Sequence, residues 1–283
     1  IFYYYLFIFS KNKSQLYLIL LSNNIQITII TLTKNDVDKF IKTLNSINNQ
    51  TQKTEIEWLI IDGSKTIKGD EESVIYRYIK NKISNNFVIR HIKSNKINLN
   101  GIYPCMNFAK KISKGNFIIY LNSGDEFYET TTLRKLFNYS KTFNNQWSLI
   151  FGQANIISTH NVKWNFPDKR LKNIKLWLKI FEPNHQAMLI SRNLANNYNF
   201  PENHGLIADG YWKRKVLENA EEIIYLNFPI SKFFLDGLSS TKPTRNNLMK
   251  IISNKNISLI RKFIFIIKFI IPSNLFFLYI YLQ

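Results

Sequence analysis

The strongest constraint on the fold is a regular alternation of apolar and amphipathic segments in the first half of the chain. β-Branched and aromatic stretches predict buried strands at residues 26–32, 55–61, 87–91 and 117–121. Apolar residues at helical spacing predict helices between these strands, at residues 37–47, 71–83 and 102–112. This order indicates an α/β fold with a mostly parallel central sheet and helices on both faces.

The pattern is looser after residue 127. A helix is expected at 131–143, and another helix opens within 206–212. Short apolar segments, which predict strands, occur at 147–151, 154–158, 188–190, 223–226 and 230–235. We expect these elements to complete the domain that the first half begins.

Polar residues follow three of the first four strands: Thr33, Asp62 and the turn Asn122–Asp125. Right-handed crossovers place these strand ends along one edge of the sheet, where open α/β sheets bind ligands. Asp62 is followed by Gly63 and Ser64, a sequence that suits a ligand contact but is also ordinary turn chemistry.

The turn after the fourth strand carries two acids, Asp125 and Glu126. Two acids with small polar neighbours suit a divalent cation that carries phosphates. A solvated acidic turn is the alternative. Because the two acids are adjacent in sequence, we expect their side chains to point in different directions.

Two residues of the second half could take part in chemistry. His185 lies between Asn184 and Gln186, and on its own could equally be a structural histidine. Asp209 stands at a predicted helix start, where it could cap the helix or act as a general base.

The composition favours some kinds of partner and excludes some kinds of site. The formal net charge is +19, which favours an anionic partner such as nucleic acid, anionic lipid or a phosphorylated substrate. A coding bias toward Lys, Asn and Ile is the alternative cause. A single cysteine, Cys105, excludes an internal disulfide and a zinc site built from cysteines. Phosphate-loop, dinucleotide-binding and serine-hydrolase motifs are absent from the sequence.

The two ends of the chain are hydrophobic. Residues 1–24 form an apolar N-terminal extension, and residues 241–283 form a basic, hydrophobic tail. Their uncharged runs are shorter than a membrane helix needs. The tail suits the membrane interface, with a helix docked on the domain as the alternative. We therefore expect a cytoplasmic protein, peripheral on the inner face of the cell membrane.

A series of motifs in a fixed order resembles the family-2 glycosyltransferases with the GT-A fold, in a bacterial surface-polysaccharide subgroup. The matching segments are Ile27–Asn35, Leu44–Thr51, Ile60–Ser64, Gly101–Asn107, Leu121–Asp125, Asn184–Gln186 and Ala208–Tyr211. The resemblance covers residues 25–240, with a nucleotide-sugar half at 25–127 and an acceptor half at 128–240.

The resemblance implies an inverting transfer from a nucleotide sugar, expected to be a UDP-sugar. It places Thr31, Thr33, Asp62 and Asn122 in the nucleotide site. It implies that Asp125 binds Mg²⁺ or Mn²⁺. The usual Asp-x-Asp motif is depleted here, because only its last acid remains.

In the acceptor half, the resemblance implies that Asp209 is the catalytic base and that His185 lies near the acceptor or the diphosphate. The acid pair usual near the base is reduced to Ala208–Asp209. The implied acceptor is a saccharide or a lipid-linked saccharide of a surface polysaccharide, with no nucleic-acid partner.

Two other functions are alternatives for this sequence. A sugar-nucleotide pyrophosphorylase would need a glycine-rich loop with arginine after the first strand, where this chain has Thr33–Asn35. A basic protein that binds membrane surfaces or nucleic acid without catalysis would rely on charge alone and tolerate the loss of Asp125.

Overall fold

The computed structural model describes residues 25–65, 73–82, 87–142, 146–158, 161–202, 208–235, 248–249, 252–253 and 259–270. The extension expected at 1–24 lies outside these residues, as does most of the tail expected at 241–283.

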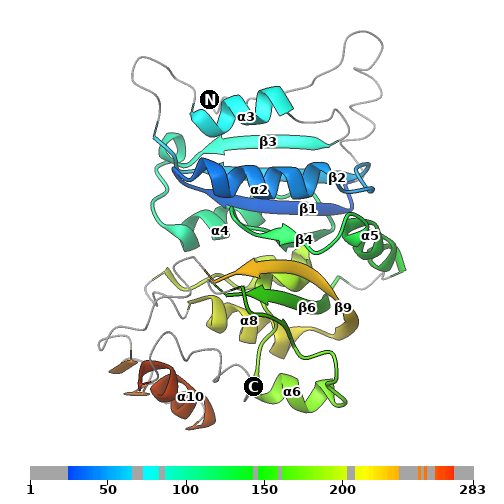
Figure 1. The fold of residues 1–283 in the computed structure, drawn as a ribbon, viewed down its shortest axis with the longest axis vertical. Coiled ribbons are helices and arrows are strands. Elements are labelled where there is room, and N and C mark those ends of the chain that lie inside the picture. Colours follow the sequence, from blue (N-terminus) through cyan, green and yellow to red (C-terminus); the bar gives the residue numbers. More distant parts are fainter. Residues whose placement is uncertain are drawn as a thin grey trace.

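The first half is a parallel sheet, as predicted (Figure 1). Its strands lie in the order β3 (Val88–Lys93), β2 (Ile56–Asp62), β1 (Ile27–Thr33) and β4 (Phe117–Tyr120). The register pairs Thr33 with Asp62 and Asp62 with Lys93. The polar strand ends therefore meet at one edge of the sheet.

Helices cover both faces of this sheet. The connecting helices are α2 (Val37–Asn48), α3 (Val74–Lys82) and α4 (Ile102–Ile112), and α4 has the predicted bounds. Phe40 of α2 and Ile75 of α3 pack in one apolar cluster with Ile29 of β1, whereas Met106 of α4 packs with Ile30 in a second cluster. Neighbouring strand residues thus point to opposite faces.

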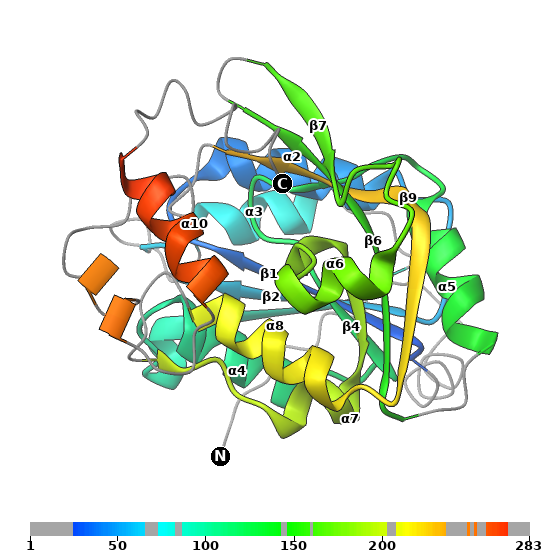
Figure 2. The ribbon, with the colours of Figure 1, turned by 90° about the horizontal axis from the view of Figure 1, so that it is seen from below.

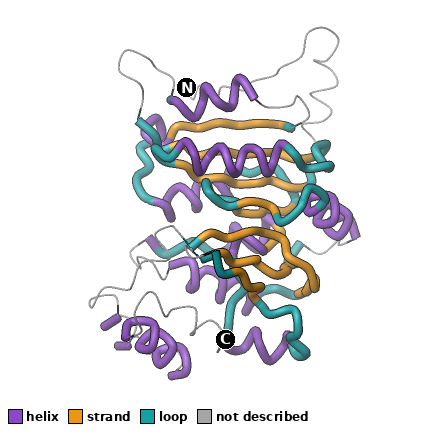
Figure 3. The backbone as a smooth tube through the Cα atoms, in the orientation of Figure 1, coloured by secondary structure: helices purple, strands orange, loops and turns teal. Residues whose placement is uncertain are grey.

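The strands of the second half, for which the sequence predicts no pairing, extend the sheet. Its strands are β5 (Glu126–Phe127), β6 (Ser148–Ile157), β7 (Lys163–Phe166), β8 (Met188–Ser191) and β9 (Glu222–Phe234). Among them only β6 and β9 pair in parallel, while the pairs β4–β8, β6–β8, β5–β9 and β6–β7 are antiparallel. The sheet is mixed: all pairs among the first four strands are parallel, as expected, whereas most pairs beyond them are antiparallel. Figure 3 shows the strands of both halves as orange segments between the helices. A short hairpin such as β6–β7 can pair only in the antiparallel sense.

Strands predicted as separate segments are continuous. β6 spans both expected strands, 147–151 and 154–158, and β9 likewise spans 223–226 and 230–235. The apolar pattern breaks at Gly152 because the β6–β9 register shifts there. A Cβ atom at Gly152 would lie 2.7 Å from the carbonyl oxygen of Phe228, so this approach of the two strands requires glycine.

The remaining helices are α5 (Thr132–Thr142), α6 (Ile174–Ile180), α7 (Arg192–Asn197), α8 (Ala208–Asn219) and α10 (Leu259–Ile270). Two short 3-10 turns, η1 (Ser94–Ile97) and η2 (His185–Ala187), precede α4 and β8. Figure 2 shows α4, α7 and α8 together on one side of the sheet, with α2 and α3 on the other. Trp212 of α8 and Leu194 of α7 pack in the same apolar cluster as Met106 of α4.

Within the described ranges, no helix has the length and hydrophobicity that a membrane span requires.

Candidate active site

Asp62 lies at the edge of the sheet, and its carboxylate is fully buried. Its Oδ1 atom accepts a hydrogen bond from the Ser64 amide (2.8 Å), and its Oδ2 atom lies 3.0 Å from His91 Nε2 and accepts from the Ser73 hydroxyl. Burial raises the pKa of Asp62, but hydrogen bonds from His91, Ser73 and Ser64 together bring it below the ordinary value. Asp62 is therefore an ionised acceptor that holds Ser64, Ser73 and His91 in place around it.

Two buried polar atoms beside Asp62 have no hydrogen-bond partner in the described structure: Thr33 Oγ1 and Lys93 Nζ. The two residues are 6% and 7% exposed, and the register places them on either side of Asp62. A buried ammonium group without a partner is unfavourable unless a ligand supplies an acceptor. Thr31 differs, since its hydroxyl donates to the Leu121 carbonyl (2.7 Å) and is occupied within the core.

The turn that carries Asp125 is fixed by α2. The Thr43 hydroxyl donates to the Asp125 carbonyl (2.7 Å) and accepts from the Gly124 amide (3.0 Å). Gly124 has a φ of +102°, a conformation that glycine adopts without strain. Asp125 is 6% exposed and its Oδ2 atom accepts from Gln186 Nε2 (2.9 Å). Glu126 points elsewhere, to Lys232 (3.3 Å), so the two acids diverge as predicted.

The second half brings a histidine and a carboxylate to the same turn. His185 Nε2 lies 3.4 Å from Asn122 Nδ2, and His185 Nδ1 lies 3.7 Å from Asp209 Oδ2. Lys213, one helical turn after Asp209 in α8, places its Nζ 3.6 Å from the same oxygen. The structure thus assembles Asn122, His185 and Asp209, predicted separately from sequence, into one row.

The electrostatics of this row favour an ionised carboxylate beside a neutral imidazole. Burial raises the pKa of Asp209, but Lys213, His185 and the Gly210 amide together hold it below the ordinary value. Burial lowers the pKa of His185 despite the nearby Asp209 carboxylate. The Asp209 side chain is 31% exposed, so it remains accessible to a substrate.

The atoms around Asp125 suit a hard cation. The Asn122 Oδ1 and Gln186 Oε1 atoms are buried acceptors without a hydrogen-bond partner in the described part of the chain. Both residues touch Asp125, Gln186 through its side-chain amide and Asn122 through its carbonyl, which accepts from the Asp125 amide (2.9 Å). Amide and carboxylate oxygens are ligands that Mg²⁺ and Mn²⁺ accept.

The described residues contain no group of three or more His, Cys, Asp or Glu side chains that could hold a metal ion. A cation at Asp125 would therefore depend on phosphate oxygens of a substrate for the rest of its coordination, which is common for Mg²⁺.

Sequence reasoning missed several members of the site. In the sequence, Gln186 stands out only as a neighbour of His185, whereas the i,i+4 spacing of Lys213 to Asp209 is a signal that predicts their contact. Tyr103 of α4 interacts with Asp209: burial and the negative charge of that carboxylate both raise the pKa of the Tyr103 hydroxyl. Glu182, held by Arg214 (2.7 Å), brings a second carboxylate that interacts with Asp209 from a distant part of the sequence.

The chain resembles known proteins in sequence and in fold. No family model matches it. It is 30% identical over 132 residues to the poly(ribitol-phosphate) β-N-acetylglucosaminyltransferase TarP of Staphylococcus aureus. That match covers 46% of this chain and 37% of TarP.

Solved structures match over more of the chain. Residues 1–349 of S. aureus TarS in complex with UDP-GlcNAc match with a TM-score of 0.58 and 17% identity, over 89% of this chain and 73% of that one. A Pyrobaculum calidifontis mannosyltransferase in complex with GDP-mannose and Mn²⁺ matches with a TM-score of 0.52 and 12% identity, over 86% of this chain and 69% of that one. In sequence and in fold, this chain is therefore similar to the GT-A-like glycosyltransferases of bacterial surface-polymer synthesis.

Proposed function

We propose that the chain is an inverting glycosyltransferase that moves a sugar from a UDP-sugar to a saccharide or lipid-linked acceptor of a bacterial surface polymer. The observation that carries this proposal is the convergence of Asn122, Asp125, His185 and Asp209 at the edge of the sheet. The complexes of TarS with UDP and UDP-GlcNAc, and the reaction named for TarP, support it.

The donor half would bind the nucleotide at the edge of β1, β2 and β3. Thr33 and Lys93 offer unpaired donors there, and Asp62 holds the surrounding backbone. Thr31 would act indirectly, by fixing β1 to the segment that leads to Asp125.

Asp125, with Asn122 and Gln186, would hold the cation. When bound, Mg²⁺ or Mn²⁺ would stabilise the negative charge that develops on the departing diphosphate. His185 lies between Asn122 and Asp209, where its neutral imidazole can contact the diphosphate or the acceptor.

Asp209 would act as the general base. It would accept the proton of an acceptor hydroxyl while that oxygen forms a bond to the anomeric carbon and the bond to the diphosphate breaks. Attack from the face opposite the leaving group inverts the configuration at that carbon. Lys213 keeps the carboxylate ionised before the acceptor binds.

A donor panel tests this proposal. With UDP-GlcNAc, Mn²⁺ and poly(ribitol phosphate), the protein should release UDP, and Asp209→Asn should lower that rate by about 10²–10⁴-fold. Calorimetry should show unchanged UDP affinity in that variant. Glu218→Gln, an exposed carboxylate change on the same helix, is the matched control. The proposal is contradicted if the protein binds no nucleotide and releases none from any sugar donor.

We also propose that α10 contacts the inner face of the cell membrane. Leu259, Phe263 and Ile270 are 82%, 62% and 69% exposed, and their spacing places them on one helical face. Replacing these three residues by serine should release the protein from anionic vesicles in a flotation assay. Undiminished flotation of this variant would refute the membrane role of α10.

A further inference from the structure

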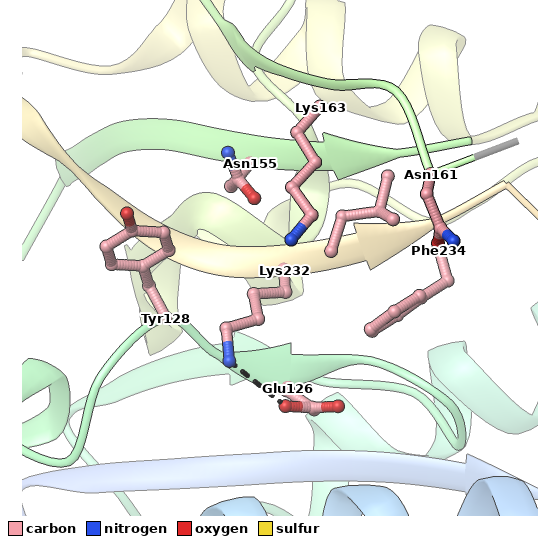
Figure 4. Close-up of a pocket in the computed structure, with 8 residues that line it drawn as sticks. Glu126, Tyr128, Asn155, Asn161, Lys163, Lys232 and Phe234 are labelled. Carbon is pink, nitrogen blue, oxygen red and sulfur yellow. Dashed lines mark hydrogen bonds and ion pairs between the residues drawn. The ribbon is translucent and has the colours of Figure 1, made fainter.

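A cavity of about 560 Å³ lies on the sheet in the second half, apart from the row that contains Asp209 (Figure 4). Its floor is built from two rows of register partners. Glu126, Lys232 and Asn155 form one row across β5, β9 and β6, and Phe234, Ile157 and Lys163 form the next across β9, β6 and β7. Because register partners point to the same face of a sheet, these side chains line one concave surface.

The charge of this cavity is positive. Lys232 Nζ lies 3.3 Å from Glu126 Oε2, which balances one of the lysines. Lys163 makes no ion pair with any residue of the described ranges, and Figure 4 shows its amine directed into the cavity. Lys42 of α2 lies over the Phe234 ring, 5.5 Å from its centre, and adds another cation at the rim. An anionic group is the ligand that this arrangement favours.

The uncharged lining suits a polyhydroxylated molecule. Asn155 and Asn161 offer amide groups, and Tyr128 and Phe234 offer aromatic surface on two sides of the cavity (Figure 4). Amides bind hydroxyl groups, and aromatic rings cover the carbon faces of sugars and polyols. A phosphate with a sugar or polyol attached would use both the lysines and this lining.

The cavity is also connected to the active site through the chain. Glu126 of the cavity directly follows Asp125, and the two side chains point in different directions. A polymer chain could therefore contact the surface at Asp125 and the cavity at Glu126 together.

We propose that this cavity binds a phosphate group of a polyanionic acceptor chain, away from the hydroxyl that reacts. The inference rests on the proposed glycosyltransferase function and specifies its acceptor as a phosphodiester-linked polyol or sugar polymer. The polymer named for TarP belongs to this chemical class.

Charge reversal at the exposed lysine tests the proposal. For the Lys163→Glu variant, the Kd of a fluorescent poly(ribitol phosphate) oligomer should rise about tenfold or more, since one phosphate contact is lost and a repulsion is added. Binding of the oligomer should also depend less steeply on salt. Lys215→Glu, at an exposed lysine of α8, is the matched control and should bind like the wild type. Circular dichroism melting verifies that both variants fold.

Two further binding measurements distinguish a failure of the cavity assignment from a failure of the proposed function. The first arm measures UDP affinity, which should be equal in the wild type, Lys163→Glu and Lys215→Glu. A wild type that does not bind UDP would count against the proposed function. A Lys163→Glu variant that binds both UDP and the oligomer like the wild type would overturn only the cavity assignment. Phosphatidylglycerol vesicles form the second arm. If binding to vesicles but not to the oligomer depends on Lys163, the cavity recognises lipid headgroups and the proposal is wrong.

Discussion

The protonation of Asp209 depends on neighbours that come from two different elements. Lys213 follows it in α8, and His185 reaches it from η2. The lysine lowers the pKa of the carboxyl group, whereas the buried imidazole is neutral near pH 7 because burial lowers its pKa. A carboxylate that is already ionised can accept a proton as soon as a hydroxyl is positioned beside it.

Removing the positive charge of Lys213 should therefore raise the pKa of Asp209. In a Lys213→Met variant, the acidic limb of the kcat/KM profile should move to higher pH, because the carboxylate holds its proton more tightly without the lysine. Lys215→Met on the same helix should leave the profile in place. An unchanged acidic limb in Lys213→Met would show that Asp209 is not the titrating base.

Lys93 gives a prediction in which stability and binding change in opposite directions. A Lys93→Met variant keeps the length of the side chain but removes a buried ammonium that lacks a hydrogen-bond partner among the described residues. The free energy of unfolding should stay equal or rise, whereas UDP affinity should fall about tenfold because a charged hydrogen bond to the nucleotide is lost. The exposed Lys96 provides the control substitution. A variant with reduced stability and full UDP affinity would contradict the assignment of Lys93 to the donor site.

Among the elements, α4 connects the two halves of the domain. Lys110 of α4 is fully buried and donates to the carbonyls of Ala195 (2.9 Å) and Tyr198 (2.6 Å) and to Asn199 Oδ1 (2.9 Å). Burial lowers the pKa of Lys110 to about 8. This side chain fixes the segment after α7, which packs against α8 and hence positions Asp209.

A Lys110→Met variant should lose about 2–4 kcal/mol of unfolding free energy, because the buried carbonyl of Ala195 and two partly buried acceptors lose their donor. The pH dependence has a definite sign. The ordinary pKa of the lysine, 10.5, exceeds its folded value of about 8, so between these values the unfolded state binds more protons. The free energy of unfolding of the wild type therefore rises with pH in this window relative to that of the variant. Urea denaturation should show that the difference between the two free energies widens from pH 8 to 10. If this difference stays constant or shrinks, the pKa of Lys110 is not lowered by burial.

The elements also show which parts of the structure the sequence could predict. The first four strands and three helices were predictable, because each is a continuous apolar or periodic segment, and α4 matches residue for residue. The strands β5 and β7 were not predictable. β5 has only two residues, and the four residues of β7 have mixed polarity, so neither carries a periodic signal. The division of β6 was mispredicted because a bulge at Gly152 resembles a turn in sequence.

The same limit applies to the site. The meeting of Thr33 and Asp62 at one edge of the sheet was predictable from parallel topology, since the ends of parallel strands lie together. The meeting of His185 with Asp209 depends on the antiparallel pairing of β8 with β4, for which the sequence carries no local pattern. The partners Gln186 and Lys93 stayed unrecognised because only their tertiary neighbours distinguish them from surface residues.

The molecule as a whole combines a strongly positive charge with one extended sheet. The formal net charge of +19 suits a nucleotide diphosphate, an anionic polymer and an anionic membrane alike. In the function that we propose, the sheet separates the nucleotide from the polymer: the nucleotide lies at the edge of β1, β2 and β3, and the polymer contacts the basic cavity across β5, β9, β6 and β7. On this account, the charge concentrates anionic substrates, and the chemistry depends on the few residues between the two halves.

The anomeric configuration of the product tests this account most directly. In UDP-GlcNAc the sugar is α-linked, so a single in-line attack by a hydroxyl deprotonated at Asp209 should give a β-linked product. Proton NMR of the glycosylated poly(ribitol phosphate) should show the anomeric signal of the β linkage, formed by the wild type and not by Asp209→Asn. An α-linked product, or equal yields of product from both proteins, would contradict the assignment of the reaction and its base.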